Sequence, residues 1–195
     1  MTFIKIIMKK LLLISLSAFL FSCTPNVKEE LNAVNNEAAF NKNVQTFMDF
    51  TIAFGEEDID GVMNLFADSA LWSPPEYNSY EWLSKDELKV ALTNYMNSFD
   101  NLKFTPGINL PGGNLVDGFW GGSRYRSDGN ENTSSLSSSN PNNIRVYGTW
   151  SSTHAESGKE TFSKWYAIVN FNDSGKIVRF NDWFNVDGLQ VQINQ

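Results

Sequence analysis

Hydrophobic residues recur at helical spacing through the middle of the chain and at every second position near its end. The spacing predicts one helix over roughly residues 40–54, a break at "GEED", and a second helix from Ile59 to Phe66 behind Asp58 as N-cap. Ser84 and Glu87 form a capping box that predicts a third helix running to about residue 99. The positions on the predicted buried faces are Phe40, Val44, Phe47, Thr51 and Phe54; Ile59, Val62, Met63 and Phe66; and Leu88, Ala91, Leu92, Tyr95, Met96 and Phe99.

From residue 144 the hydrophobic period changes to two. The stretches "IRVYGTWSST", "FSKWYAIVNF" and "KIVRFNDWF" are predicted strands, and the turn sequence "NDSG" joins the last two. Helices that precede strands in this order favour an α+β domain, with the helices on one side of an antiparallel sheet. Residues 37–195 have the size of one such domain.

A polar stretch, residues 121–143, separates the predicted helices from the predicted strands. Its sequence "GGSRYRSDGNENTSSLSSSNPNN" is rich in Ser, Asn and Gly and too polar to pack. Loops of this length inside a compact domain are usually either functional lids or disordered segments. The sequence leaves both alternatives open for this flexible loop.

The N-terminus has the pattern of a secretory signal over residues 1–22. Lys5, Lys9 and Lys10 precede the apolar run "LLLISLSAFLF", whose 11 residues are fewer than the roughly 20 that span a bilayer. The following "LFSC" resembles the lipobox of bacterial lipoproteins, although Phe21 is larger than the residue usual there. The resemblance implies a lipidated Cys23 and a lipid-anchored protein of the bacterial cell envelope. We expect the outer membrane, with exposure at the cell surface as a further possibility.

The alternative for Cys23 is a free thiol behind an ordinary cleaved signal. It is the only cysteine, so no disulfide can form within the chain. The polar residues 23–36 predict a tether between the lipid and the domain. Within it, "KEE" resembles an export signal of surface lipoproteins, and a simple solvated linker is the other interpretation.

The charge balance argues against nucleic acid as a partner. The whole chain carries a net charge of -7, and removal of residues 1–22 takes away three lysines and no acid, which leaves -10 on 173 residues. Phosphate backbones repel such a surface, and no cluster of Lys and Arg compensates for it.

Two stretches resemble a known superfamily. The sequence "GEEDIDGVMNLFADSALWSPP" is similar to the helix-helix-strand opening of nuclear transport factor 2-like proteins, and residues 148–193 resemble the closing half of their SnoaL-like branch. The resemblance implies a cone: a curved antiparallel sheet wrapped over three helices, with an apolar ligand pocket between them and a possible homodimer through the outer sheet face. It implies that the pocket is lined by Phe50, Trp72, Trp150, Trp165, Ala167 and Phe184.

The catalytic residues of ketosteroid isomerases, which share this superfamily, have no match in the sequence. Phe50 stands where they carry a tyrosine, and Ser73 or Pro74 where they carry the aspartate base. Ala167 replaces their protonated aspartate, and Asn185 replaces an acid in the SnoaL-like tail. These side chains can neither form nor stabilise an enolate.

The last predicted strand contains one ionisable residue on an apolar face. Alternation places Val178, Phe180, Asp182 and Phe184 on one face and Ile177, Arg179, Asn181, Trp183 and Asn185 on the other. Burial of Asp182 without a partner would raise its pKa and make it a candidate acid or base. His154, the only histidine, is a candidate partner for it if both residues reach the mouth of the pocket. The alternatives are an Asp182 at the frayed strand end, bonded to backbone or water, and a solvent-facing His154.

Three hypotheses for function follow. The first is a lipid-anchored module that binds a small, largely apolar molecule. The second is an acid/base isomerase, cyclase or dehydratase that uses Asp182 and His154. The third is a module that only dimerises or docks a neighbour, for which a solid interior would be diagnostic. No metal site and no cofactor is expected.

Replacement of the lone cysteine tests the anchor. Cys23→Ser should release the protein from the membrane fraction into the soluble fraction, because lipid chains bind membranes by roughly 0.8 kcal/mol per buried CH₂. The measurement is fractionation of the expressing cells, with the parent sequence in parallel. Retention of the serine variant in the membrane fraction would contradict lipidation at this residue.

Overall fold

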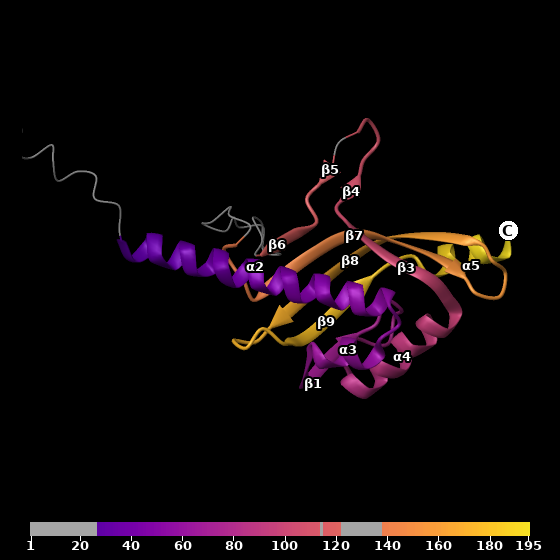
Figure 1. Cartoon of the computed structure of the whole chain (residues 1–195), viewed down its shortest axis with the longest axis horizontal. Coiled ribbons are helices and arrows are strands. Elements are labelled where there is room, and N and C mark those ends of the chain that lie inside the picture. The colour runs from indigo at the N-terminus through magenta and orange to yellow at the C-terminus, as the bar shows by residue number, and fades with distance from the viewer. Residues whose placement is uncertain (1–26, 114, 122–137) are drawn as a thin grey trace, which may run out of the picture. The chain divides into compact units, whose positions relative to one another are not determined.

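The computed structural model describes residues 27–113, 115–121 and 138–195 (Figure 1). The predicted signal peptide (1–22), the lipidation site Cys23 and residues 122–137 of the predicted loop lie outside this part of the chain. The chain divides into two compact units, residues 1–35 and 36–195, and the mixed fold belongs to the second. Within the described ranges, every helix is too short or too polar to cross a bilayer.

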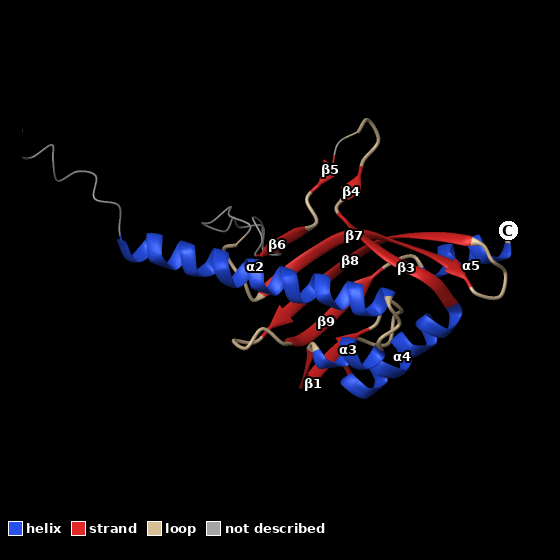
Figure 2. Cartoon of the chain, in the orientation of Figure 1, coloured by secondary structure: helices blue, strands red, loops and turns tan. Residues whose placement is uncertain are grey.

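Helices and strands are mixed along the chain (Figure 2). The helices are α2 (Val27–Gly55), α3 (Ile59–Asn64), α4 (Lys85–Ser98) and α5 (Val186–Asn194). One sheet is formed by β1 (Phe66–Ser73), β2 (Leu83–Ser84), β3 (Phe99–Pro106), β6 (Phe119–Gly121), β7 (Asn143–His154), β8 (Glu160–Phe171) and β9 (Ile177–Trp183). A separate ribbon pairs β4 (Ile108–Asn109) with β5 (Leu115–Val116).

The strand order in the sheet is β2-β1-β9-β8-β7-β3, and β6 pairs with β7 as well. This arrangement confirms the predicted α+β class with a curved sheet and helices. One pair differs from expectation, because β1 runs parallel to β9 while the other pairs are antiparallel. The parallel pair is possible because α4 and five strands of the sheet intervene between β1 and β9 in the chain.

Two predicted helix ends were wrong. Phe66 begins β1 and Phe99 begins β3, although both were placed on helices. Both side chains are buried in the structure, at 3% and 5% exposure. Each residue is buried and lies just after a helix, so its position also fits the helical spacing of apolar residues. The spacing alone therefore could not show whether the backbone there is helical or extended. Helix α2 also starts at Val27, within the predicted tether, rather than near residue 40.

The local end signals of the helices are confirmed. The Ser84 backbone N–H donates to Glu87 Oε2 at 2.7 Å, and the Glu87 N–H donates back to Ser84 Oγ at 3.3 Å. Asp58 caps α3 by accepting the Gly61 N–H at 2.8 Å. These bonds satisfy N–H groups that have no partner inside the first turn of a helix.

The predicted turn between β8 and β9 is confirmed as well. Asn172 Oδ1 accepts the N–H groups of Ser174 and Lys176 at 3.1 and 2.9 Å. Gly175 has a φ of 82°, a conformation that costs glycine little.

The predicted alternation of buried and exposed side chains along β9 fails only at the start of the strand. Ile177 is fully buried, and a register shift separates it from the rest of the β8–β9 ladder. From Phe180 onward the predicted face points inward.

An aromatic core joins α2 to the sheet. Phe47 is 0% exposed and lies at the centre of this core. Its ring centroid is 5.5 to 5.9 Å from those of Phe50, Phe104, Phe119 and Trp165. Helix α2 is therefore held over the sheet by ring contacts from three different strands.

The end of the predicted loop is packed structure rather than a free segment. Asn43 on α2 is only 2% exposed, and its Nδ2 donates to the Pro141 carbonyl at 2.9 Å and to Asn142 Oδ1 at 3.1 Å. Ser139 Oγ donates to the Gly121 carbonyl at 3.0 Å. Residues 138–143 are thus tied to both α2 and β6.

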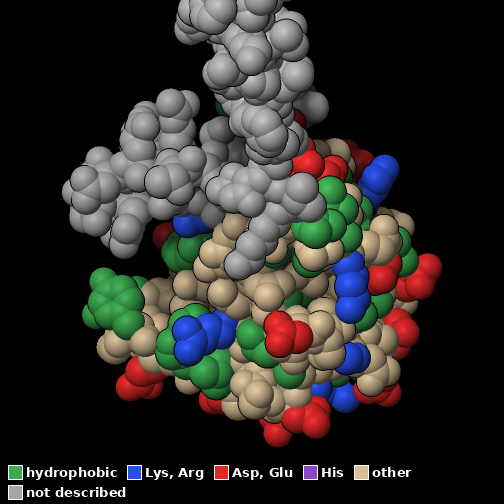
Figure 3. Space-filling view, turned by 90° about the vertical axis from the view of Figure 1, so that its left-hand side faces the viewer, with side chains coloured by type: hydrophobic (Ala, Val, Ile, Leu, Met, Phe, Trp, Pro, Cys, Tyr) green, Lys and Arg blue, Asp and Glu red, His purple; other side chains and the backbone are tan. Residues whose placement is uncertain are grey.

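The surface carries mixed charges. On the face shown in Figure 3, Lys and Arg side chains lie singly among Asp and Glu side chains rather than in one basic patch. Two ion pairs link Lys85 to Asp68 at 3.3 Å and Lys89 to Asp60 at 2.8 Å. Both are exposed enough for solvent to weaken them.

Candidate functional site

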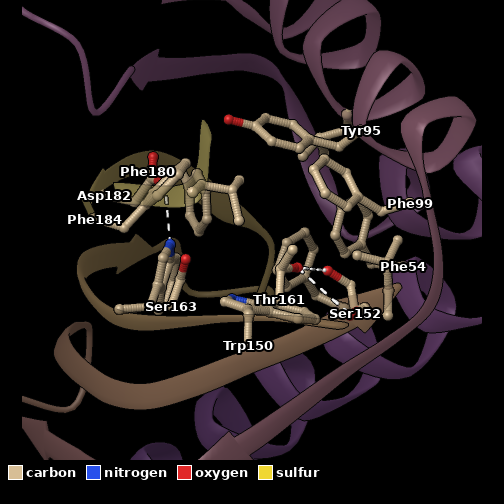
Figure 4. A pocket seen from close by; sticks show the side chains of 15 residues that line it. Phe54, Tyr95, Phe99, Trp150, Ser152, Thr161, Ser163, Phe180, Asp182 and Phe184 are labelled. Atoms are coloured by element: carbon tan, nitrogen blue, oxygen red, sulfur yellow. Dashed lines mark hydrogen bonds between the residues drawn. The ribbon is translucent and has the colours of Figure 1, made fainter. Parts of the chain in front are cut away.

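A pocket lies between α2, α4 and α5 on one side and the inner face of β7, β8 and β9 on the other (Figure 4). Its cavity volume is about 90 Å³. Fifteen residues line it, of which eight are aromatic and one is charged. They are Phe50, Phe54, Leu92, Tyr95, Phe99, Leu102, Trp150, Ser152, Thr161, Ser163, Trp165, Phe180, Asp182, Phe184 and Leu189.

The C-terminal helix closes one end of this pocket through Leu189. Asn185 caps α5 by accepting the Gly188 N–H at 2.8 Å. Gln192 clamps the helix to β8, because its side-chain amide accepts the Phe162 N–H at 2.8 Å and donates to the Phe162 carbonyl at 3.0 Å. Phe162 lies beyond the part of β8 that pairs with β9, so the glutamine occupies a backbone edge that would otherwise be open.

Asp182 places a carboxylate in this aromatic environment. The residue is 6% exposed. Its Oδ1 accepts the indole N–H of Trp72 at 2.9 Å, and its Oδ2 accepts the indole N–H of Trp165 at 3.1 Å. Each oxygen therefore has one indole donor and retains a further lone pair. Two rigid aromatic side chains fix the orientation of the acid.

Burial raises the pKa of Asp182 to about 6. The two indole bonds favour the charged form and oppose this rise, and the negative charge of Glu76 adds to it. The pKa of Tyr95 is also raised, first by burial and then by the charges of Glu76 and Asp182. Tyr95 therefore holds its proton at neutral pH, whereas Asp182 exchanges its proton close to neutrality.

The remaining polar groups of the pocket are hydroxyls. Ser152 and Thr161 face each other across β7 and β8, with their oxygens 2.7 Å apart. Figure 4 shows them at a distance along the wall from Asp182, with Tyr95 on the opposite side. The pocket thus offers one ionisable acid, a phenol and small hydroxyls in an otherwise apolar wall.

Solved structures identify the architecture that carries this pocket. A protein from Bacillus subtilis with a suggested isomerase activity has a TM-score of 0.58 and 15% identity, covering 80% of this chain and 95% of that chain. A suggested polyketide cyclase from Xanthomonas campestris has a TM-score of 0.55 and 10% identity, covering 80% and 98%. An NTF2-like protein of unknown function from Burkholderia pseudomallei has a TM-score of 0.51 and 19% identity, covering 79% and 98%. The chain has the nuclear transport factor 2-like fold.

At these identities the likeness extends to the fold and no further. No family model matches the sequence, and a search of curated proteins gives no match. The function of this nuclear transport factor 2-like domain must therefore be argued from its own residues.

Most of the pocket residues implied by the resemblance line the cavity. Phe50, Trp150, Trp165 and Phe184 do so. Two others have different positions. Trp72 is not part of the lining and instead holds Asp182 through its indole N–H. Ala167 is fully buried and pairs with Asp182 in the β8–β9 ladder, also without lining the cavity.

His154 lies outside the pocket of this domain. Its Nδ1 is 2.9 Å from Ser157 Oγ in the turn after β7, and its ring packs on Phe99 with centroids 5.5 Å apart. The side-chain hydrogen bonds to the Asp182 carboxylate come from Trp72 and Trp165. The structure therefore does not bring His154 and Asp182 together, and the partners of the buried Asp182 are two indole groups.

The sequence missed several residues that line the pocket, among them Tyr95 and Leu189. Tyr95 was expected only as a core residue of its helix, and Leu189 lies on a helix that was not predicted. The capping pattern of Asn185 with Gly188 could have revealed α5. Among the described residues, no three His, Cys, Asp or Glu side chains are grouped as a metal site would require.

Asp182 should make the stability of the domain depend on pH. Its pKa is about 6 in the folded state and has an ordinary value of 3.8 in the unfolded state. Between these values the folded state holds a proton that the unfolded state has released, so the free energy of unfolding falls as the pH rises. The fall from about pH 3.5 to pH 7.5 is about 3 kcal/mol, at about 1.4 kcal/mol for each pKa unit.

The variant Asp182→Asn isolates this effect. The asparagine amide replaces one of the two acceptor oxygens by an NH₂ donor, so one indole N–H loses its partner, and we expect the variant to be less stable than the parent at pH 3.5. The deficit should shrink by about 3 kcal/mol by pH 7.5, because the variant has no charge to bury. Urea unfolding of both proteins, with the exposed Asp100→Asn as the matched control, measures the difference. A deficit that stays constant with pH would contradict a raised pKa.

Proposed function

We propose that the domain binds a small, largely apolar molecule in the pocket and orients it at Asp182. One observation carries this proposal: a single buried carboxylate stands in a cavity whose lining is otherwise aromatic, aliphatic and hydroxyl. Pockets with an apolar wall and few placed polar groups are the usual form of small-molecule sites. The cavity also disfavours a module that only dimerises or docks, because its interior is not solid.

The cavity volume limits the size of the ligand. About 90 Å³ is well below the roughly 300–1,000 Å³ of drug-sized sites. It is of the order of the engineered apolar cavity of about 150 Å³ that binds benzene. The ligand that fits is thus about one ring or a short branched chain in size.

The second candidate function is acid/base catalysis on the bound molecule. The pKa of Asp182, about 6, lies close to the value at which a carboxyl group both accepts and donates a proton near neutral pH. Each of its oxygens retains a lone pair. The suggested isomerase and cyclase activities of two proteins with this fold are compatible with such a role.

In this second function Asp182 acts as the acid or base, and Tyr95 is the available neutral donor. Phe50 and Ala167 supply no hydrogen bond to a substrate oxygen, so a ketosteroid-isomerase type of oxyanion site is not part of the proposal. His154 has no part in it, since its partners are Ser157 and Phe99.

We further propose that Cys23 anchors this domain in the bacterial envelope. The support is the sequence alone: the apolar run before the cysteine and its likeness to a lipobox. The domain would then meet its ligand outside the cytoplasm.

Filling the pocket should abolish binding. Ser163 lines the cavity and is half-buried, whereas its neighbour Lys164 on β8 is exposed. Ser163→Leu adds apolar volume inside the cavity and should weaken binding of benzene at least about tenfold, which is about 1.4 kcal/mol. Lys164→Leu is the matched control and should bind like the parent.

The measurement is a titration with benzene followed by NMR shifts of the residues that line the pocket. Saturable shifts in the parent that persist unchanged in Ser163→Leu would place the ligand elsewhere. Native mass spectrometry of protein purified from its own host would then identify the physiological ligand.

The physiological ligand identified in this way serves as the substrate in a test of catalysis. If Asp182 is the acid or base, turnover by Asp182→Asn should fall at least about a hundredfold while the ligand still binds. His154→Ala should retain turnover, since His154 lies outside the pocket. Equal turnover in the parent and in Asp182→Asn would show that Asp182 is not the acid or base, and only the binding function would remain.

A further inference from the structure

Asp182 is a buried acid without a counter-charge. Its two hydrogen-bond donors are neutral indoles, and the charged group that shifts its pKa is the acid Glu76. The described residues that line the pocket include no Lys, Arg or His. Buried charges in proteins are normally paired, because an unpaired charge is costly away from water. The residues that line the pocket therefore give the Asp182 carboxylate no positive partner, and a cationic ligand would supply one.

The walls around Asp182 suit a cation rather than an anion. Aromatic rings carry negative charge on their faces and attract cations within about 6 Å of the ring centre. The lining rings form close pairs: Phe50 with Phe180 at 5.5 Å, Phe54 with Trp150 at 5.3 Å, and Tyr95 with Phe184 at 6.2 Å. A ligand in this cavity has ring surfaces on several sides, as Figure 4 shows.

From these two features we infer that the pocket selects a compact organic cation, with a tertiary or quaternary ammonium group between the aromatic walls and the Asp182 carboxylate. This inference rests on the proposed function and names the chemical class of its ligand. Methyl groups on the nitrogen satisfy the apolar wall, and the positive charge neutralises the acid. An inorganic cation would lack the apolar surface that the aromatic wall contacts.

A second acid acts on the groups of the pocket. Glu76, in the segment after β1, is exposed, and its charge raises the pKa of both Asp182 and Tyr95. Glu76, Tyr95 on α4 and Asp182 on β9 are the titratable groups that act on one another here. The charged groups among them are acids, so their charge favours a cationic ligand.

Three probes of nearly equal shape test the inference. They are choline, its neutral isostere 3,3-dimethylbutan-1-ol, and the anion 3,3-dimethylbutanoate. At pH 7.5 we expect choline to bind at least about tenfold more tightly than the alcohol, and the anion not to bind measurably. Isothermal titration calorimetry on the folded domain gives the affinities, and NMR shifts of Phe184 and Trp150 report the location.

The pH dependence identifies the group that binds the charge. Choline does not titrate, so its affinity should follow the ionised fraction of Asp182 and be about tenfold lower at pH 5 than at pH 7.5. The affinity of the alcohol should change little over this range. This comparison uses the parent protein and does not depend on any variant folding.

Two variants complete the test. Asp182→Asn should weaken choline at least about tenfold and the alcohol less than about threefold. Glu76→Gln should weaken choline about twofold at low ionic strength and not at about 0.5 M salt, where exposed charges are screened. Glu81→Gln, another exposed acid of the same segment, is the matched control for Glu76.

The outcomes separate this inference from the proposed function. If the alcohol binds in the pocket as tightly as choline at both pH values, the inference fails and a pocket for neutral apolar molecules remains. If choline binds but its affinity ignores both pH and Asp182→Asn, the carboxylate does not hold the cation and the inference fails as well. If choline, the alcohol and benzene all fail to bind, the proposed function is overturned together with the inference.

Discussion

The contact of the Phe47 ring with the sheet is the interaction on which the two layers of the domain depend. Phe47 projects from the long helix α2, is fully buried, and touches rings from β3, β6 and β8. Loss of a buried ring of this kind typically costs about 3–5 kcal/mol, since the cavity left behind cannot close fully. Phe47 also contacts Phe50 and Trp165, which line the pocket, so the same core supports the pocket wall.

Close packing around this contact also depends on Gly148, which has no side chain. Phe104 lies against Gly148 on the neighbouring strand, where a Cβ would come within 2.2 Å of the Phe104 ring. The ring fills the space over the glycine and reaches Trp150 and Trp165, with centroids 5.1 and 5.8 Å away. Two walls of the pocket are thus oriented by the core behind them rather than by the ligand.

Asp182 shows how stability and function oppose each other in this domain. A hydrophobic residue at that position would avoid the cost of a buried charge, and the two indoles offset only part of that cost. The carboxylate is nevertheless held by two tryptophans that come from separate strands. A costly group with fixed orientation inside an apolar cavity is the arrangement expected of a working site. The acid gives the pocket its polarity, its response to pH and its preference for positive charge.

The sequence by itself determined the features whose cause lies within a few residues. The Ser84–Glu87 capping box, the Asp58 cap and the "NDSG" turn arise from bonds over three or four positions, and the structure has all of them. The two-residue period of the last strands arises from side chains that alternate between the faces of the sheet, and the structure has these strands as well. The same period placed Asp182 beside Phe180 and Phe184 on the inward face. The resemblance to the superfamily supplied the curved sheet and four of the eight aromatic residues of the pocket wall.

Only the tertiary structure decided which distant residues meet. Trp72 bonds Asp182 across 110 positions, and Asn43 bonds Pro141 across 98. The parallel pairing of β1 with β9 creates the first contact, and no local pattern specifies that pairing. Phe66 and Phe99 are buried whether helical or extended, so burial alone could not place the ends of α3 and α4. Helical and strand periods report which side of an element is apolar, whereas the register between strands decides which side chains share a pocket.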